Sequence, residues 1–123
     1  MLSLSQVNVY YYQEVDGTCP VREFLRAQPA PVRAQAEARI RLLAERGHQL
    51  RRPYADYLAD DLYELRWHTG RVQYRILYCF HGRGTAVLLH ALTKEGAIPA
   101  TDLTRSHRRK KLFTQNPRLH TQP

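Results

Sequence analysis

The chain has 123 residues, 43% of them hydrophobic, and carries 19 Lys and Arg against 11 Asp and Glu, a formal net charge of +8. This size and composition support one folded domain and exclude a disordered chain. Met1–Tyr10 shows no signal-peptide pattern and no apolar run approaches membrane-span length, which predicts a cytoplasmic protein without a membrane partner. The excess of basic residues favours a polyanionic partner, with nucleic acid ahead of an acidic protein.

The first part of the chain predicts one strand and two helices. Val7–Glu14 is rich in β-branched and aromatic residues, which is typical of a strand. A short helix is expected over Val21–Gln28, with Thr18 as a possible cap. Pro31 begins a second helix that Gly47 ends, so the two helices form a helical hairpin.

The second helix carries several arginines that resemble a nucleic-acid surface. Glutamates lie one turn away from them, so a solvated face with ion pairs is the better interpretation. The segment that follows, residues 51–61, is expected to be a loop. The arginines concerned are Arg33, Arg39, Arg41 and Arg46.

Three consecutive antiparallel strands are predicted next. Apolar and polar residues alternate along Leu62–His68 and Arg71–Phe80, and a third strand is expected over Thr85–Leu92. Thr69-Gly70 and Gly82-Arg83 are the expected two-residue turns. The aromatic residues on the apolar face are interpreted as core, with base stacking as the alternative. They are Trp67, Tyr74 and Tyr78.

Two-residue turns predict a cross-strand row of polar side chains. In this register Glu64 lies opposite Arg75, and Arg75 lies opposite His90. A turn at Arg83-Gly84 would shift the partners by one residue and break the match of faces, so the first register is preferred.

The two cysteines carry no metal-binding pattern. Cys19 falls in a loop and Cys79 in a strand, and neither has CxxC or Cys/His spacing nearby. We therefore expect free thiols in a reducing compartment, no metal site and no cofactor.

The C-terminal region predicts a basic helix and then a flexible tail, Thr114–Pro123. Thr101 or Asp102 can cap this helix, which extends through Lys111. The fold class is therefore α+β: a small antiparallel sheet, made of the N-terminal strand and the three-strand meander, packed on the helical hairpin. We expect one domain over residues 1–113.

The face of the sheet away from the helical hairpin is expected to stay partly open. Basic and polar side chains converge on it, with one lysine just beyond the end of a strand. They are Arg66, Gln73, Arg75, His90 and Lys94.

The order and spacing of these segments resembles the RelE/ParE superfamily of bacterial toxins, and within it the HigB-like toxins related to phage-derived proteins. The resemblance covers Tyr10–Phe113. The motifs that carry it are PVREFL, DLYELRW, VQYRILYCF and VLLHALTKEGAIPATDLTRSHRRKKLF.

This resemblance implies a RelE-like fold and the toxin of a type II toxin–antitoxin system. Such toxins bind in the ribosomal A site, cleave mRNA without a metal and inhibit translation, and an antitoxin, usually a helix-turn-helix protein, silences them. Two alternatives stay open: a ParE-like poison of DNA gyrase without nuclease activity, and a decayed prophage toxin that only binds its antitoxin. The oligomeric state stays open as well.

Site residues follow from matching motifs. Arg66 in ELRW and Arg75 in YRILY match basic strand positions that these toxins use for RNA and phosphate, and Lys94 in HALTK matches the basic position ending the following strand. Arg75 is the candidate that stabilises the phosphorane, with a structural pair to Glu64 as the alternative.

The residue that moves the proton is left open. His90 is a candidate from the predicted register. Many relatives carry a catalytic tyrosine or histidine soon after the last strand, where residues 97–100 offer none. Further RNA contacts are expected from Arg71, Gln73, Arg105, Arg108, Arg109, Lys110 and Lys111.

Overall fold

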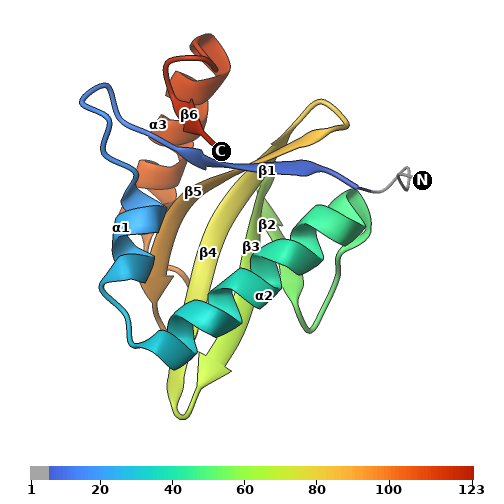
Figure 1. Ribbon diagram of the computed structural model, residues 1–123, viewed down its shortest axis with the longest axis vertical. Helices are drawn as coiled ribbons and strands as arrows, with labels where there is room; N and C mark the ends of the chain where they lie inside the picture. Colours follow the sequence, from blue (N-terminus) through green and yellow to red (C-terminus); the bar gives the residue numbers. More distant parts are fainter. Residues whose placement is uncertain (1–5) are drawn as a thin grey trace.

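The computed structural model describes residues 6–123, which form a six-stranded, mostly antiparallel sheet with three α-helices (Figure 1). This is the α+β class that the sequence predicts. The strand order is β2-β3-β4-β5-β1-β6, and β1 pairs with β5 in parallel. The elements are β1 (Asn8–Tyr12), α1 (Pro20–Arg26), α2 (Ala30–Arg46), the 3-10 turn η1 (Gly47–Gln49), β2 (Ala55–Ala59), β3 (Leu62–Thr69), β4 (Val72–His81), β5 (Thr85–Thr93), α3 (Ala100–Gln115) and β6 (Thr121–Gln122).

Proline residues open both N-terminal helices. Pro20 lies in the first turn of α1 and Pro31 in that of α2, where the helix leaves N–H groups unpaired in any case. The prediction that Thr18 caps α1 is wrong, because the capping residue is Cys19. The Thr18 N–H instead donates to the Asp16 carboxylate in the loop before the helix.

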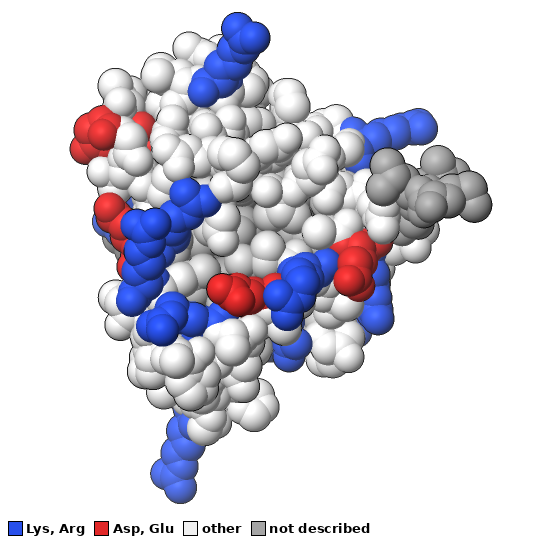
Figure 2. Space-filling model, in the orientation of Figure 1, with Lys and Arg blue, Asp and Glu red and all other residues white. Residues whose placement is uncertain are grey.

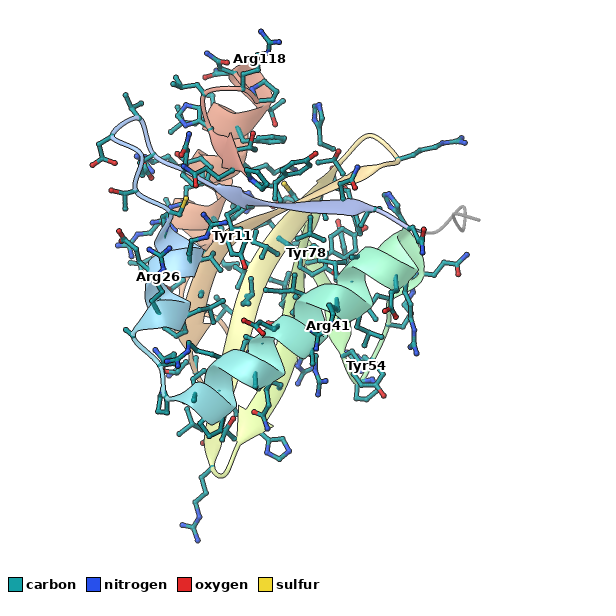
Figure 3. All side chains as sticks on the ribbon, viewed as in Figure 1. Tyr11, Arg26, Arg41, Tyr54, Tyr78 and Arg118 are labelled. Atoms are coloured by element: carbon teal, nitrogen blue, oxygen red, sulfur yellow. The ribbon has the colours of Figure 1, made fainter. Side chains whose placement is uncertain are left out.

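α2 crosses one face of the sheet and ends, as predicted, at Gly47 with φ 51°. Its buried residues Val32, Ala36 and Leu43 pack into a core that also contains Tyr78. Figure 3 shows Tyr78 between this helix and the sheet. Acidic and basic side chains alternate along the outer side of α2, as a solvated surface requires (Figure 2).

β2 is a strand where the sequence predicts a loop. Only Ala55 is buried in it, and its polar residues gave no strand signal. β2 pairs with β3 on one side and forms an edge of the sheet. Asp60 and Asp61 adopt positive φ angles of 50° and 61° in the tight turn that joins the two strands. An edge strand needs only one apolar contact face, so a strand can form there even where apolar and polar residues alternate only weakly.

The predicted register between β3 and β4 is wrong by two residues. The turn lies at Gly70-Arg71, so Arg66 pairs with Arg75 and Glu64 pairs with Leu77. Because the displacement is even, each residue keeps its predicted face of the sheet.

The predicted two-residue turn at Gly82-Arg83 is wrong, because His81 pairs with Thr85 and the turn contains the three residues 82–84. A β-bulge then changes the register between β4 and β5 further. The pairing shifts between Leu77 and Tyr78, which makes Leu89 an extra residue in β5 and sets His90 opposite Leu77. The predicted row of Glu64, Arg75 and His90 is therefore not formed. Arg75 faces Leu92 instead.

α3 covers part of the second face of the sheet and buries Phe113. Its N-terminal cap is Pro99, so neither Thr101 nor Asp102 has the predicted capping role. Residues 114–123 also differ from the predicted flexible tail, since α3 extends to Gln115 and β6 pairs antiparallel with β1.

Both cysteines are buried free thiols, and Cys79 lies in β4 as predicted. Burial raises the pKa of the Cys79 thiol to about 12, so it stays protonated at neutral pH. Among residues 6–123, no helix is both long and apolar enough to cross a membrane.

Candidate active site

The part of the second sheet face that lies over β3 and β4 carries a cluster of charged side chains. Arg66 and Arg75 are direct cross-strand partners, and Glu64 contacts both. Glu64 Oε1 lies 3.6 Å from Arg66 Nε, and Glu64 Oε2 lies 3.7 Å from Arg75 Nε. The Glu64 and Arg75 side chains are only 5% and 11% exposed, against 38% for Arg66. The cluster therefore runs from a buried carboxylate to a half-exposed guanidinium.

Glu64 is held in an environment that disfavours its charge. Burial raises the pKa of the Glu64 carboxyl, and this effect outweighs the attraction of Arg75 and Arg66. Both ion pairs are longer than a hydrogen bond, and within residues 6–123 Oε2 has no hydrogen-bond partner. A buried carboxyl group with a raised pKa beside two cations is a candidate for proton transfer.

The sequence analysis assigned Glu64 only as a structural partner of Arg75. Its alternation with arginines on a polar strand face was visible in the sequence, but its burial was not, because β2 and β4 pair with β3 on either side of it only in the fold. Its ion pair with Arg75 does form, although the two residues are diagonal neighbours and not direct partners.

Asp56 of the edge strand β2 supports the exposed side of the cluster. Its Oδ2 accepts hydrogen bonds from Arg52 Nε at 2.9 Å and Arg52 Nη2 at 2.7 Å, and it lies 3.8 Å from Arg66 Nη1. The hydrogen bond from Arg52 holds the pKa of the Asp56 carboxyl below its usual value. Asp56 therefore stays ionised and orients Arg66.

The remaining predicted residues of this face lie at one end of the sheet. Gln73 pairs with His68 of β3, and the Gln73 carbonyl accepts a hydrogen bond from the Lys94 N–H at 3.1 Å. Lys94 is exposed just beyond β5, and Arg71 is exposed in the β3–β4 turn. The fold thus brings Arg66, Arg75 and Gln73 onto one face, with Lys94 and Arg71 at its border.

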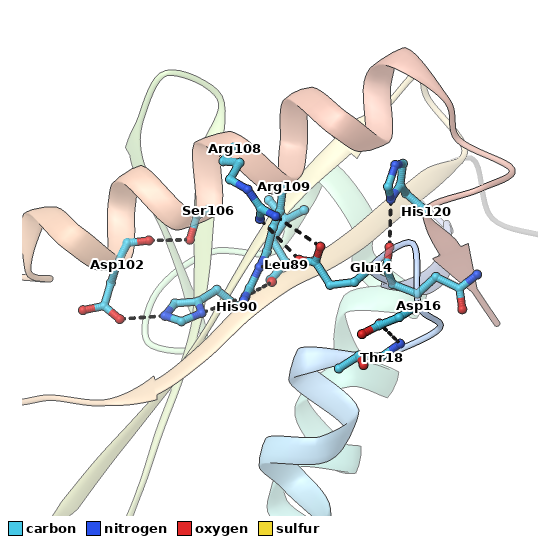
Figure 4. Close-up of polar contacts among 11 residues, drawn as sticks. Glu14, Asp16, Thr18, Leu89, His90, Asp102, Ser106, Arg108, Arg109 and His120 are labelled. Carbon is cyan, nitrogen blue, oxygen red and sulfur yellow. Dashed lines mark hydrogen bonds and ion pairs between the residues drawn. The ribbon is translucent and has the colours of Figure 1, made fainter.

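His90 lies apart from this cluster, in the contact between β5 and α3 (Figure 4). Its Nε2 lies 2.6 Å from Asp102 Oδ1, and Arg109 Nη1 donates to its Nδ1 at 3.0 Å. An accepting Nδ1 carries no proton, so Nε2–H donates to Asp102. Burial lowers the pKa of His90, and Arg109 lowers it further, against the opposing effect of the Asp102 hydrogen bond. The ring is therefore a neutral link between α3 and the sheet.

The basic residues of α3 do not form one surface. Arg109 is largely buried and donates to the Leu89 carbonyl, and Arg108 forms a two-point contact with Glu14 (Figure 4). Lys110 Nζ donates to the Asp60 carbonyl at 3.1 Å. The other two predicted RNA contacts on this helix, Arg105 and Lys111, are exposed.

We expect the exposed basic residues of α3 to act through charge alone. If the chain binds RNA, replacing Arg105, Arg108 and Lys111 with glutamine should weaken that binding and flatten its log-log salt slope by up to about 2 units, at about 0.7 per lost phosphate contact. Filter binding across a salt series measures this. Unchanged affinity together with lost antitoxin binding would instead assign this side of α3 to the antitoxin.

No group of three or more His, Cys, Asp and Glu side chains is placed to hold a metal ion among residues 6–123. The charged groups of the site are the Glu64 and Asp56 carboxyls, the Arg66 and Arg75 guanidiniums and Lys94 at its border.

Comparison with known families gives one match. The family described as "Phage derived protein Gp49-like (DUF891)" matches residues 23–111, which is more than half of the chain and includes the whole charged cluster. No curated protein matches the chain.

Proposed function

Because the chain belongs to the Gp49-like family of phage-derived proteins, a family of RelE/HigB-like toxins, we propose that it is the toxin of a type II toxin–antitoxin system that cleaves mRNA on the ribosome. The observation that supports a nuclease is the cluster of Glu64, Arg66 and Arg75. A cognate antitoxin, the ribosome and mRNA are its proposed partners.

The proposed reaction is a transfer within the RNA chain. Glu64 removes the proton from a ribose 2′-hydroxyl, and the 2′-oxygen attacks the adjacent phosphorus. The bond from phosphorus to the 5′-oxygen breaks, and this oxygen leaves with a proton. The products are a 2′,3′-cyclic phosphate and a 5′-hydroxyl.

The two arginines supply the electrostatic part of catalysis. Arg75 and Arg66 are paired across the strands, so their guanidinium groups can bind neighbouring oxygens of one phosphate as negative charge develops on it. Both are already placed by Glu64 and Asp56, which lowers the cost of organising them. Lys94 at the border is the proposed proton donor to the leaving 5′-oxygen.

This assignment gives the proton-transfer role to Glu64 in place of His90. Both ring nitrogens of His90 are occupied, and Leu77 lies opposite it. Glu64, by contrast, has an oxygen without a hydrogen-bond partner among the described residues and contacts both arginines.

Induction of the wild-type protein should arrest growth and produce cleavages within translated transcripts. Primer extension on transcripts isolated after induction locates the cuts, and the same transcripts incubated as free RNA should be cut poorly. Intact transcripts together with gyrase-linked DNA breaks would replace this proposal with a gyrase poison. Intact transcripts and undamaged DNA would leave only antitoxin binding.

A further inference from the structure

β2 pairs with β3 only as far as Leu65, so among the described residues the rest of β3 has no partner strand on this side. The last contact with the segment before β2 is the Arg66 N–H donating to the Tyr54 carbonyl at 2.9 Å. Beyond it lies an open pocket of about 460 Å³ whose lining includes Arg39, Arg52, Arg66, Trp67 and Gln73. This volume is within the range of small-ligand sites, roughly 300–1,000 Å³.

Three arginines from three different elements meet at this pocket. Arg39 comes from α2, Arg52 from the loop before β2 and Arg66 from β3, and no carboxylate is among the described residues that line the pocket. Such a group of cations favours an anionic ligand. Two carboxylates contact these arginines from outside the lining: Asp56 contacts Arg52 and Arg66, and Glu64 contacts Arg66.

Arg39 is held in place although it lies on a helix surface. Its Nε donates to the Arg66 carbonyl at 3.2 Å, and its guanidinium lies 5.0 Å from the centre of the Tyr54 ring. Figure 3 shows Tyr54 at the loop that follows α2. The hydrogen bond to the Arg66 carbonyl joins α2 directly to β3, so the position of the Arg39 guanidinium is fixed relative to Arg66.

The pocket also contains polar groups of the kind that read a nucleobase. Trp67 is 4% exposed, and its indole Nε1 has no hydrogen-bond partner within residues 6–123. A buried N–H without a partner is costly and rare in folded proteins. The Gln73 amide can both donate and accept, as the edge of a base requires.

We propose that this pocket binds the nucleotide adjoining the scissile phosphate, with Arg39 and Arg52 on its phosphate and the Gln73 amide on its base, beside the Trp67 indole. The identity of the ligand as RNA rests on the proposed function. Arg66 lies both in the pocket and in the charged cluster, so a bound strand passes directly from one to the other.

Trp67 is the one tryptophan of the chain and therefore reports on the pocket by itself. The probe is a short single-stranded oligonucleotide with deoxyribose throughout, which lacks the 2′-hydroxyl and cannot be cleaved. We expect the fluorescence emission of Trp67 to change saturably on titration with this strand. Inorganic phosphate should change it little. Arg39→Gln should weaken binding roughly 10- to 100-fold, as loss of a charged hydrogen bond does.

Arg41→Gln is the matched control, because Arg41 lies on the same helix but outside the pocket lining and should leave binding unchanged. Arg52→Gln is the second variant, since this side chain is 75% exposed and its loss is tolerated by the fold. Binding detected by anisotropy of a labelled strand without any change at Trp67 would overturn the proposal, as would equal affinities of the Arg39, Arg52 and Arg41 variants. A Trp67 response to purified antitoxin but not to the strand would make the pocket a protein-binding site and also overturn it.

The titration does not use cleavage, so it separates the two proposals. A wild-type protein that leaves transcripts intact but shows the Trp67 response refutes the nuclease and keeps the nucleotide pocket. Cleaved transcripts without a Trp67 response refute the pocket alone.

Discussion

Replacing Arg75 with alanine should slow mRNA cleavage about 100- to 1,000-fold and abolish growth arrest, because the variant loses a preorganised donor to the developing phosphate charge. Arg75→Lys keeps the charge but loses the planar fork, so we expect intermediate toxicity. Primer extension and growth curves after induction measure both effects. Full toxicity of Arg75→Ala would remove Arg75 from the site.

The stability of Arg75→Ala separates catalysis from folding. Arg75 is more buried than the sequence analysis expected, and its loss leaves the buried Glu64 carboxylate with Arg66 alone. We therefore expect a loss of up to about 3 kcal/mol in the free energy of unfolding at neutral pH, as for a broken buried pair. The double variant Arg75→Ala/Glu64→Gln should recover most of this loss and still be inactive. Recovered toxicity of this double variant would show that cleavage needs neither Arg75 nor Glu64.

Glu64→Gln should have opposite effects on activity and stability. Loss of a general base lowers cleavage about 100- to 10,000-fold. Stability should rise at neutral pH, since burial raises the pKa of the Glu64 carboxyl above its unfolded value near 4.5. A group with a raised folded pKa contributes its full stability below the unfolded pKa and loses it as the pH rises through the folded pKa. Glu64→Gln has no titrating carboxyl at this position, so its stability does not fall in this way as the pH rises.

Urea unfolding from pH 4 to pH 8 measures the difference in the free energy of unfolding between wild type and Glu64→Gln. This difference should vanish near pH 4 and grow as the pH rises. Glu95→Gln, at an exposed position after β5, is the control and should change neither property. A Glu64→Gln variant that is less stable than wild type at pH 8 would show that the two arginines outweigh burial. A variant that cleaves at the wild-type rate would exclude Glu64 as the base.

Local patterns in the sequence determined β1, β3, β4, β5 and most of the three α-helices, and which residues of β3 and β4 share a face, but not β2 or β6. The alternation along β3 and β4 placed Glu64, Arg66 and Arg75 on the polar face, and Pro31 and Gly47 marked the limits of α2, because these signals depend only on near neighbours in the chain. The family resemblance rested on the same segments, and the match over residues 23–111 agrees with it.

Tertiary structure decided which of these residues meet. The position of the β3–β4 turn and the bulge at Leu89 set the register, and both depend on backbone conformations that no alternation pattern encodes. Packing of α3 on β5 enclosed His90 with Arg109, while burial turned Glu64 from a partner of Arg75 into a carboxyl with a raised pKa. Burial and the pKa of a side chain depend on many neighbours that are distant in the sequence. The residue types of the site could therefore be read from the sequence, but their chemical roles required the fold.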